Sequence, residues 1–455
     1  MKSVALHNLG CKVNAYEMDF MQQMLQEKGY KIVPFDEEAD IYVVNTCTVT
    51  NIADRKSRQM LHRAKKKNPD AVVVAVGCYV QTGQEALLKD SAVDLAIGNN
   101  RKKDLVEILE AYLESRGETK AAAMPGGLPE RGRETTAPLV DTIDIASAPY
   151  EEMTLKTTAE HTRAYIKIQD GCNQFCSYCI IPYARGRVRS RMEEDILKEA
   201  QGMAEAGYRE VVLTGIHISS YGADRGGSEL VRLLEKLSEI GGIERIRLGS
   251  LEPGIVTEEF AAAISALPKV CPHFHLSLQS GSDSVLRRMN RRYDSAGYLE
   301  AVEKLRKYYA DPAITTDVIA GFPGETEEEF SQTEDFLRRV GFYEMHIFKY
   351  SRRQGTRAAA MEGQLTEAEK AARSDRLIHL EREMSRAYRE AFLGKTEEVL
   401  FEERWEKDGK TYWIGHTTRY LKVARAAEQE KNMQNRIVAG RLVSFLEEDV
   451  LLMEN

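Results

Sequence analysis

The sequence lacks the long apolar runs that membrane proteins contain. Its 455 residues are 43% hydrophobic and 29% charged, a composition typical of soluble globular proteins. No stretch approaches the roughly 18 consecutive apolar residues of a membrane-spanning helix. The segment from Met1 to His7 contains no apolar core followed by a small-residue cleavage site, so no secretory signal is evident. We therefore expect a cytoplasmic protein with no membrane partner.

Positive charge and cysteine are also scarce. The chain has 63 Lys and Arg residues against 71 Asp and Glu residues, a formal charge of −8. This net charge excludes a protein whose whole surface is positive for binding nucleic acid. Any RNA must therefore bind at local basic patches. Only seven cysteines are present, and a disulfide framework is not expected in a reducing compartment. Metal binding or catalysis by these cysteines is therefore favoured.

Short apolar runs alternate with helical patterns at the start of the chain. Strand-like runs occur at Val4–Leu6, Ile41–Val44 and Val72–Val76, and helical segments lie at Tyr16–Lys28 and Asp54–Lys67. Strand–helix alternation of this kind predicts an α/β fold with a doubly wound parallel sheet.

The same alternation resumes near Thr162, with predicted strands separated by predicted helices. Six β/α units predict a partial (β/α)6 barrel, although an open six-stranded sheet fits the same count. The strand segments are Ala164–Ile168, Glu210–Thr214, Arg245–Leu248, Phe274–Leu278, Thr315–Ile319 and Met345–Tyr350. The helical segments are Glu193–Ala206, Leu230–Ile240, Glu258–Ala266, Ser295–Tyr309 and Glu327–Val340.

The remaining segments predict a long helix, a small barrel and a linker. Thr366 and Glu369 form a capping-box pair, and Gly394 stands where the glycine after a helix would. Short β-like runs from Lys395 onward predict a small all-β barrel. The stretch around Met124–Pro129 has little periodicity and indicates a linker. The expected divisions are an N-terminal domain (1–114), a linker (115–155), a barrel domain (156–393) and a C-terminal barrel (394–455).

Three cysteines are spaced for an iron–sulfur cluster. Cys172, Cys176 and Cys179 form a C-x3-C-x2-C run directly after a predicted strand, at the strand end where such barrels have their active sites. Thiolate is the ligand that iron–sulfur clusters require, and three ligands for four irons leave one iron open to a chelating cofactor. A zinc knuckle would need a fourth ligand nearby, and the nearest histidine, His161, lies across the predicted strand.

A second group of cysteines occupies equivalent positions in the first sheet. Cys11, Cys47 and Cys78 each follow a predicted parallel strand, and the carboxyl ends of parallel strands share one edge of the sheet. The pattern favours a second metal site over three buried hydrophobic thiols, which is the alternative reading. Cys271 has no cysteine neighbour in the sequence and is interpreted as a plain thiol.

These motifs resemble the methylthiotransferase family of radical S-adenosylmethionine (SAM) enzymes over nearly the whole chain. The N-terminal part is similar in the run Leu9–Asn14 and in Asn45–Val49. The central part is similar in Gly171–Pro182, Ser250–Pro253, Leu278–Ser282 and Gly321–Thr326, and the C-terminal part, with Gly415–Thr418, resembles the RNA-binding TRAM module. Within the family, the run Gly10–Asn14 is most similar to the bacterial MtaB-type branch.

The resemblance implies two [4Fe–4S] clusters, SAM and a tRNA substrate. Cys172, Cys176 and Cys179 would bind the cluster that cleaves SAM, and Cys11, Cys47 and Cys78 would bind an auxiliary cluster that carries the transferred sulfur. The MtaB-type branch converts N6-threonylcarbamoyladenosine, beside the anticodon, to its 2-methylthio form. An electron donor protein and a sulfur source are further implied partners.

Other residues are weaker expectations. Tyr178, Gly215, Ser280 and Asp317 lie in the loop or near strand ends and are expected to contact SAM or substrate, although turn or strand-end chemistry explains each equally well. A clump at Arg287, Arg288, Arg291 and Arg292 is one of three basic runs that indicate phosphate contacts. The RNA-contact residues are expected to be Arg63, Lys65, Lys66, Lys67, Arg185 and Arg187.

Two alternatives stay open. Within the enzyme class, the substrate is instead an isopentenyladenosine in tRNA or a ribosomal-protein aspartate. From another class, the chain is a non-catalytic iron–sulfur sensor that binds RNA. Such a sensor would have no use for an open iron.

Overall fold

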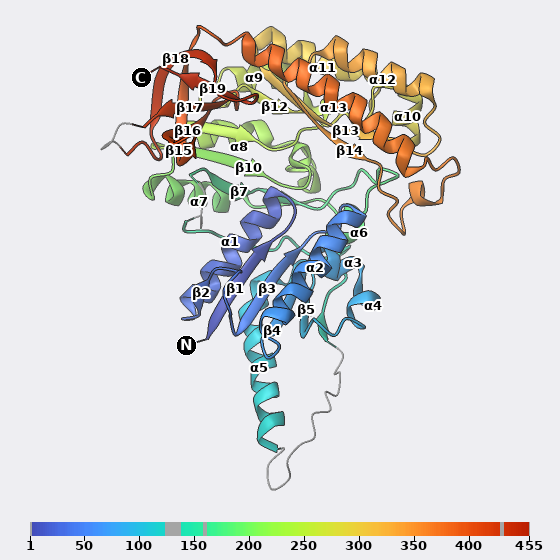
Figure 1. Cartoon of the computed structure of the whole chain (residues 1–455), viewed down its shortest axis with the longest axis vertical. Helices are drawn as coiled ribbons and strands as arrows, with labels where there is room; N and C mark the ends of the chain where they lie inside the picture. The colour runs from blue at the N-terminus through green and yellow to red at the C-terminus, as the bar shows by residue number, and fades with distance from the viewer. Residues whose placement is uncertain (1, 123–137, 158–161, 428–431, 455) are drawn as a thin grey trace. The chain divides into compact units, whose positions relative to one another are not determined.

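The computed structural model describes residues 2–122, 138–157, 162–427 and 432–454 (Figure 1). The chain divides into two compact units. The first comprises Met1–Ala159, Asp170–Asn173 and Cys179–Arg191, and the second comprises Glu160–Gln169, Gln174–Tyr178 and Met192–Asn455. Within the described residues, no helix combines the length and apolar character needed to cross a membrane.

A six-stranded parallel sheet forms the centre of the first unit, in the order β2-β1-β3-β4-β5-β6. The doubly wound sheet expected from the sequence is confirmed, but three of its strands have only three residues each and left no periodic signal. The strands are β1 (Ser3–Asn8), β2 (Lys31–Val33), β3 (Ile41–Thr46), β4 (Val72–Gly77), β5 (Leu95–Ile97) and β6 (Leu139–Asp141).

Helices cover both faces of this sheet, as Figure 1 shows. Residues of α1 and α5 pack on one face, and residues of α2, α3 and α4 pack on the other. Because β3 and β4 are covered on both sides, every one of their residues is buried, which explains why they read as continuous apolar runs. The helices are α1 (Lys12–Glu27), α2 (Asn51–Lys67), α3 (Cys78–Thr82), α4 (Gln84–Leu87), α5 (Leu105–Ala122) and α6 (Ile181–Arg185).

The segment expected to be a linker is partly regular structure. Helix α5 continues into it as far as Ala122, and Leu139–Asp141 forms β6, which pairs with β5. A three-residue strand has too few side chains for a period-2 pattern, so β6 was not predicted. The predicted linker core, Met124–Pro129, lies outside the described residues.

The second unit contains six parallel strands that follow the order of the chain. They form two three-stranded sheets, β11-β10-β7 and β12-β13-β14, and a parallel bridge between Leu251 and Leu276 connects them. The six predicted strands are confirmed, although β12 is shorter than expected because Leu276 and Gln279 join only through isolated bridges. The strands are β7 (Ala164–Lys167), β10 (Glu210–Thr214), β11 (Arg245–Leu248), β12 (His273–His275), β13 (Ala313–Ala320) and β14 (Glu344–Lys349).

The predicted helices between these strands are also present, with one short addition. They are α7 (Glu193–Glu205), α8 (Leu230–Glu239), α9 (Glu258–Ser265), α10 (Asp283–Arg288), α11 (Ser295–Tyr308) and α12 (Glu327–Val340). The long helix α13 (Glu367–Glu390) begins with the predicted capping box between Thr366 and Glu369.

Two short strands, β8 (Gln169–Asp170) and β9 (Arg189–Ser190), lie on either side of the cysteine loop in the sequence.

The last part of the second unit is a closed five-stranded barrel, in the order β15-β16-β17-β19-β18. Its apolar interior includes Val399, Trp413 and Leu451, which come from the predicted β-like runs and from one strand that was not predicted. The strands are β15 (Thr396–Lys407), β16 (Lys410–Thr417), β17 (Lys422–Ala426), β18 (Ile437–Phe445) and β19 (Val450–Met453).

Candidate metal centres

Cys176 lies against a buried arginine in the second unit. Arg291 Nη1 is 3.1 Å from Cys176 Sγ, and Arg291 Nη2 is 3.1 Å from Glu252 Oε1. The Arg291 side chain is only 7% exposed. The arginine therefore connects Cys176 to the carboxylate of Glu252.

Glu252 connects this arginine to the loop. Its carboxylate also accepts hydrogen bonds from Gln174 Nε2 at 2.6 Å and from His217 Nε2 at 2.7 Å. Burial acts to raise the pKa of Glu252, but the His217 hydrogen bond and the Arg291 charge outweigh it and hold that pKa below its ordinary value. Glu252 therefore stays ionised at neutral pH and fixes both Gln174 and Arg291.

Backbone hydrogen bonds anchor the middle of the cysteine loop. Ser177 N donates to Met289 O, and Ser177 O accepts from Ala358 N. Beside it, Tyr178 packs edge-on against Phe322 at 6.4 Å between ring centroids, within an apolar cluster that also contains Ile319. This packing fixes the tyrosine, and its expected contact with an adenine stays a prediction.

The ends of the loop belong to the first unit and depend on a glycine. Cys172 N donates to Gly186 O at 3.0 Å. Gly171 has a φ of +73°, and a Cβ at this position would lie 1.8 Å from Arg187 O. Only glycine is compatible with both the backbone angle and the close approach.

The three remaining cofactor expectations have different outcomes. Ser280 is fully buried, and its hydroxyl hydrogen-bonds Thr333 Oγ1 and accepts from Ser282 N, so its contacts are internal. A Cβ on Gly215 would approach Gln169 O and Gln169 Oε1 to 3.0 Å. The glycine therefore lets the end of its strand pack closely against Gln169. Asp317 is partly exposed and lies 3.5 Å from His275.

Cys11, Cys47 and Cys78 lie at the carboxyl ends of the adjacent strands β1, β3 and β4, as the sequence predicts. A Cβ on Gly10, next to Cys11, would lie 3.1 Å from Cys47 Sγ. Burial raises the pKa of Cys47 to about 11, and the nearby Cys78 and Cys11 thiols add to this rise. The three thiols are therefore close enough to interact electrostatically.

Their spacing differs from that of a single-ion site. In the described part of the chain, only His275, Asp317 and His346 bring three ligand atoms within 4.8 Å of one another. The Cys11, Cys47 and Cys78 sulfurs therefore do not all lie within that distance of one another.

Asn14, which the site prediction omitted, ties two of these strand ends together. Its Nδ2 donates to Leu9 O at 2.7 Å and to Thr46 O at 3.1 Å, the carbonyls two residues before Cys11 and one residue before Cys47. Its Oδ1 accepts a hydrogen bond from Arg185 Nη2 at 2.7 Å. The asparagine amide thus holds the edge of the sheet to a buried arginine.

Arg185 is a buried structural cation, and its predicted RNA contact is wrong. Its side chain is 1% exposed and forms ion pairs with Glu17 Oε1 at 2.6 Å and Asp170 Oδ2 at 3.1 Å. Lys102, fully buried, also pairs with Glu17, and Arg189 Nη2 lies 3.9 Å from Asp170. A side chain enclosed by these carboxylates cannot reach a phosphate.

The ion pairs of this network join three cations to two carboxylates. Lys102, Arg185 and Arg189 are three cations, whereas Glu17 and Asp170 are two carboxylates. The Cys11 and Cys78 thiols interact electrostatically with Arg185. A [4Fe–4S] cluster held by three thiolates is an anion, so the donor set and its surroundings fit such a cluster.

The basic residues of α2 are only partly available for RNA. Arg63 pairs with Asp36 at 2.5 Å, and Lys65 is largely buried against Asp94 at 2.7 Å. Lys67 donates to the carbonyl of Asp36. Lys66 and Arg187 are exposed. Lys65 is therefore largely inaccessible to a phosphate, and the RNA contacts of the exposed positions stay a prediction.

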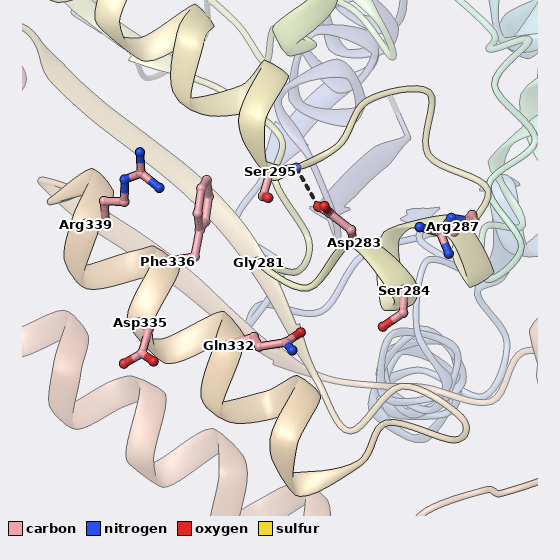
Figure 2. Close-up of a pocket in the computed structure, with 9 residues that line it drawn as sticks. All are labelled: Gly281, Asp283, Ser284, Arg287, Ser295, Gln332, Asp335, Phe336 and Arg339. Atoms are coloured by element: carbon pink, nitrogen blue, oxygen red, sulfur yellow. Dashed lines mark hydrogen bonds between the residues drawn. The ribbon is translucent and has the colours of Figure 1, made fainter.

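The basic residues near position 290 also have different surroundings. Arg288 pairs with Glu329, whereas Arg287 lines a pocket of about 610 Å³ between α10, α11 and α12. Figure 2 shows this pocket, where Asp283 accepts a hydrogen bond from Ser295 N. Neither a cysteine nor Tyr178 or Asp317 lines it, so it is separate from the candidate metal centres.

Cys271 is expected to resist alkylation in the native apoprotein. It is 1% exposed, and burial raises its pKa to about 11, so almost none is thiolate at pH 8, the form that alkylating reagents attack. Iodoacetamide labelling followed by peptide mass spectrometry should modify the exposed Cys11 and leave Cys271 unmodified until denaturant is added. Equal labelling of both in the native state would contradict this burial.

Comparisons with known proteins agree with this arrangement. Residues 166–337 match the Radical SAM superfamily and residues 3–98 match Uncharacterized protein family UPF0004. A Bacillus subtilis protein named threonylcarbamoyladenosine tRNA methylthiotransferase MtaB is 40% identical, covering 93% of this chain and 90% of its own length. The MtaB of Aquifex aeolicus is 41% identical over 86% of this chain and 91% of its own.

A second enzyme name occurs among the relatives. The tRNA-2-methylthio-N(6)-dimethylallyladenosine synthase of Moorella thermoacetica is 37% identical over 88% of this chain and 87% of its own. Among solved structures, the radical SAM methyltransferase TsrM from Kitasatospora setae matches with a TM-score of 0.54 and 16% identity, covering 76% of this chain and 75% of that one. That likeness supports the fold. The chain belongs to the radical SAM methylthiotransferases of tRNA.

Proposed function

We propose that this chain attaches a methylthio group to C2 of N6-threonylcarbamoyladenosine next to the anticodon of tRNA. The observation that carries the proposal is the 40–41% identity, over 86–93% of the chain, to two proteins named for that reaction. The two groups of three cysteines support it, because the reaction needs both a radical and a sulfur atom. A tRNA substrate would put the enzyme in the cytoplasm.

Two [4Fe–4S] clusters and two molecules of SAM are part of the proposal. Cys172, Cys176 and Cys179 would hold one cluster, and the second would be held by Cys11, Cys47 and Cys78. When bound, the first supplies the electron that cleaves SAM and the second carries the sulfur that is transferred.

The protein's own groups prepare both sites. Arg291 contacts Cys176 Sγ at 3.1 Å, and Glu252 orients Gln174 of the loop through its 2.6 Å hydrogen bond. At the other site, Asn14 fixes two strand ends. The charge of Arg185 compensates a buried anion.

The domain assignments complete the proposal. The segment 1–114 would be the methylthiotransferase domain and 156–393 a radical SAM domain with a partial (β/α)6 barrel. The segment 394–455 would be a TRAM module. RNA phosphates would meet the exposed Lys66 and Arg187, and an electron donor protein and a sulfur source would act as partners.

Dimethylallyladenosine in tRNA is the second candidate substrate. The specific observation in its favour is the Moorella thermoacetica relative of that name, at 37% identity. The ribosomal-protein substrate and the iron–sulfur sensor have no comparable support.

Expression in a bacterial host that lacks its own threonylcarbamoyladenosine methylthiotransferase tests the proposal. The intact chain should restore 2-methylthio-N6-threonylcarbamoyladenosine in tRNA digests analysed by mass spectrometry. The Cys172→Ala variant should not, because it removes one proposed cluster ligand, whereas Cys271→Ser should restore it fully. If a parallel host lacking the dimethylallyl enzyme is complemented instead, the second candidate is correct. Failure in both hosts would reject a tRNA substrate.

A further inference from the structure

Three polar side chains meet on neighbouring strands of the second unit. His275, Asp317 and His346 come from β12, β13 and β14, and their ligand atoms lie within 4.8 Å of one another. His275 Nε2 is 3.5 Å from Asp317 Oδ2. The two imidazole rings stack at 5.9 Å between centroids with 23° between their planes.

Strand register puts this group on the face of the sheet that meets the cysteine loop. Asp317 is the register partner of His346, and His275 Nδ1 contacts Thr315 Oγ1 at 3.1 Å. Successive residues of a strand point to opposite faces, so Thr315, Asp317 and Ile319 share one face. Ile319 packs in the same apolar cluster as Tyr178 of the cysteine loop.

An exposed aromatic ring lies on the same face. Phe348 is 46% exposed, is the register partner of Ile319 and follows His346 by two residues. Neighbouring parallel strands are about 4.8 Å apart and a strand rises about 6.6 Å over two residues. The ring is therefore next to the polar group. RNA-binding proteins use exposed aromatic rings to stack unpaired bases.

We propose that His275, Asp317, His346 and Phe348, the modified-base face, bind the substituted adenosine. Phe348 stacks on the adenine, and the polar group hydrogen-bonds the substituent on N6. The proposal rests on the proposed function and specifies how that site selects its substrate.

The chemistry of the two named substrates differs at this substituent. A threonylcarbamoyl group has a carboxylate, a hydroxyl and urea N–H groups. Imidazole N–H groups donate to the carboxylate, and the Asp317 carboxylate accepts from the urea or the hydroxyl. A dimethylallyl group has no polar atom, so it offers no hydrogen bond to His275, Asp317 or His346. The modified-base face therefore favours the threonylcarbamoyl substrate.

Two imidazoles and a carboxylate are also ligands for divalent metals. The adjacent Phe348 distinguishes the two uses, because a bare ion gains nothing from an exposed aromatic ring, whereas a base does. Metal binding is accordingly an outcome that would overturn the proposal.

Binding of anticodon stem-loops to the cluster-loaded protein tests the proposal. Three stem-loops differ only at the target adenosine, which is unmodified, threonylcarbamoylated or dimethylallylated, and fluorescence anisotropy under anaerobic conditions gives each Kd. The wild type should bind the threonylcarbamoyl form most tightly. His346→Leu should weaken only that form, by ~10- to 100-fold, as expected for charge-assisted hydrogen bonds. Phe348→Leu should weaken all three forms, because stacking is common to every base.

A matched control and the metal content complete the experiment. His379→Leu changes an exposed histidine of α13, 78% exposed, and should leave every Kd unchanged. If the wild type prefers the threonylcarbamoyl form but His346→Leu keeps that preference, the modified-base face is wrong and the proposed function survives. If the wild type prefers the dimethylallyl form, both fail. A stoichiometric divalent metal that is lost with His346→Leu, measured by mass spectrometry of metals, would identify an ion site instead.

Discussion

Replacing Arg185 by leucine is expected to destabilise the first unit by about 3–5 kcal/mol, the cost of removing one partner from a buried ion-pair network. Asp170 would lose its 3.1 Å ion pair while Arg189 stays 3.9 Å away, and Asn14 Oδ1 would lose its 2.7 Å donor. Leucine cannot compensate, because it removes a charged partner from two buried carboxylates and gives them no added solvation.

The effect can be assigned to one unit. Both tryptophans, Trp405 and Trp413, lie in the C-terminal barrel, so their fluorescence reports urea unfolding of the second unit. Hydrogen exchange of peptides from β3 and β4 reports the first. Arg185→Leu should speed exchange in those peptides and leave the tryptophan transition in place. The exposed Arg63→Leu should change neither by more than about 0.5 kcal/mol.

The converse result has a clear meaning. If Arg185→Leu keeps normal exchange in β3 and β4 but weakens binding of tRNA, Arg185 contacts RNA and the buried network has no stabilising role. Arg185→Lys separates charge from geometry, since lysine keeps the cation but cannot form the two-sided contact to Glu17 and Asp170.

The local sequence pattern was sufficient to predict the helices and strands that bury a regular apolar face. Strands β10 and β11 and helix α12 begin and end where the sequence indicates, because apolar periodicity is a local signal. The cysteine positions could also be predicted, since residues after parallel strands meet at one edge whatever the details of packing.

Partners that are distant in sequence could not be predicted. Arg185 was interpreted as part of a basic run, but Glu17 and Asp170 neutralise it, and the first of these is 168 positions away. Lys65 is likewise paired with Asp94. The sequence shows which charged residues follow one another along the chain. The solvation and the ion-pair partners of each side chain depend on the residues that the fold places against it. The burial of Ser280 was missed for the same reason.

Glu252, His217 and Arg291 were missed as a group even though a signal existed. Ser250–Pro253 was among the motifs that resemble the family, and it follows β11 directly, at the strand end where active-site residues gather. The rule that identified the cysteines after β1, β3 and β4 would also have selected Glu252. Its partners His217 and Arg291 follow other strands and become recognisable only when the hydrogen bonds are known.

Replacing Cys176 by alanine is expected to abolish reductive cleavage of SAM and to remove about half of the iron, since one of two clusters would lose a ligand. Cys47→Ala should also lose about half of the iron but keep the cleavage of SAM, because Cys47 belongs to the other group of thiols. Iron and sulfide analysis of the anaerobically reconstituted protein, with 5′-deoxyadenosine formation under dithionite, measures both quantities.

The two variants must differ for the assignment of two independent centres to stand. Cys271→Ser, at a buried thiol outside both groups, should keep all of the iron and full cleavage, and it controls for the loss of a cysteine as such. Full iron in Cys176→Ala would remove Cys176 from the ligand set, and its contact with Arg291 would then be an ordinary buried hydrogen bond. Loss of cleavage in both cluster variants would mean that electrons reach SAM only through the second centre. The buried positive charge around Arg185 would then act on the reduction step rather than on the sulfur that is transferred.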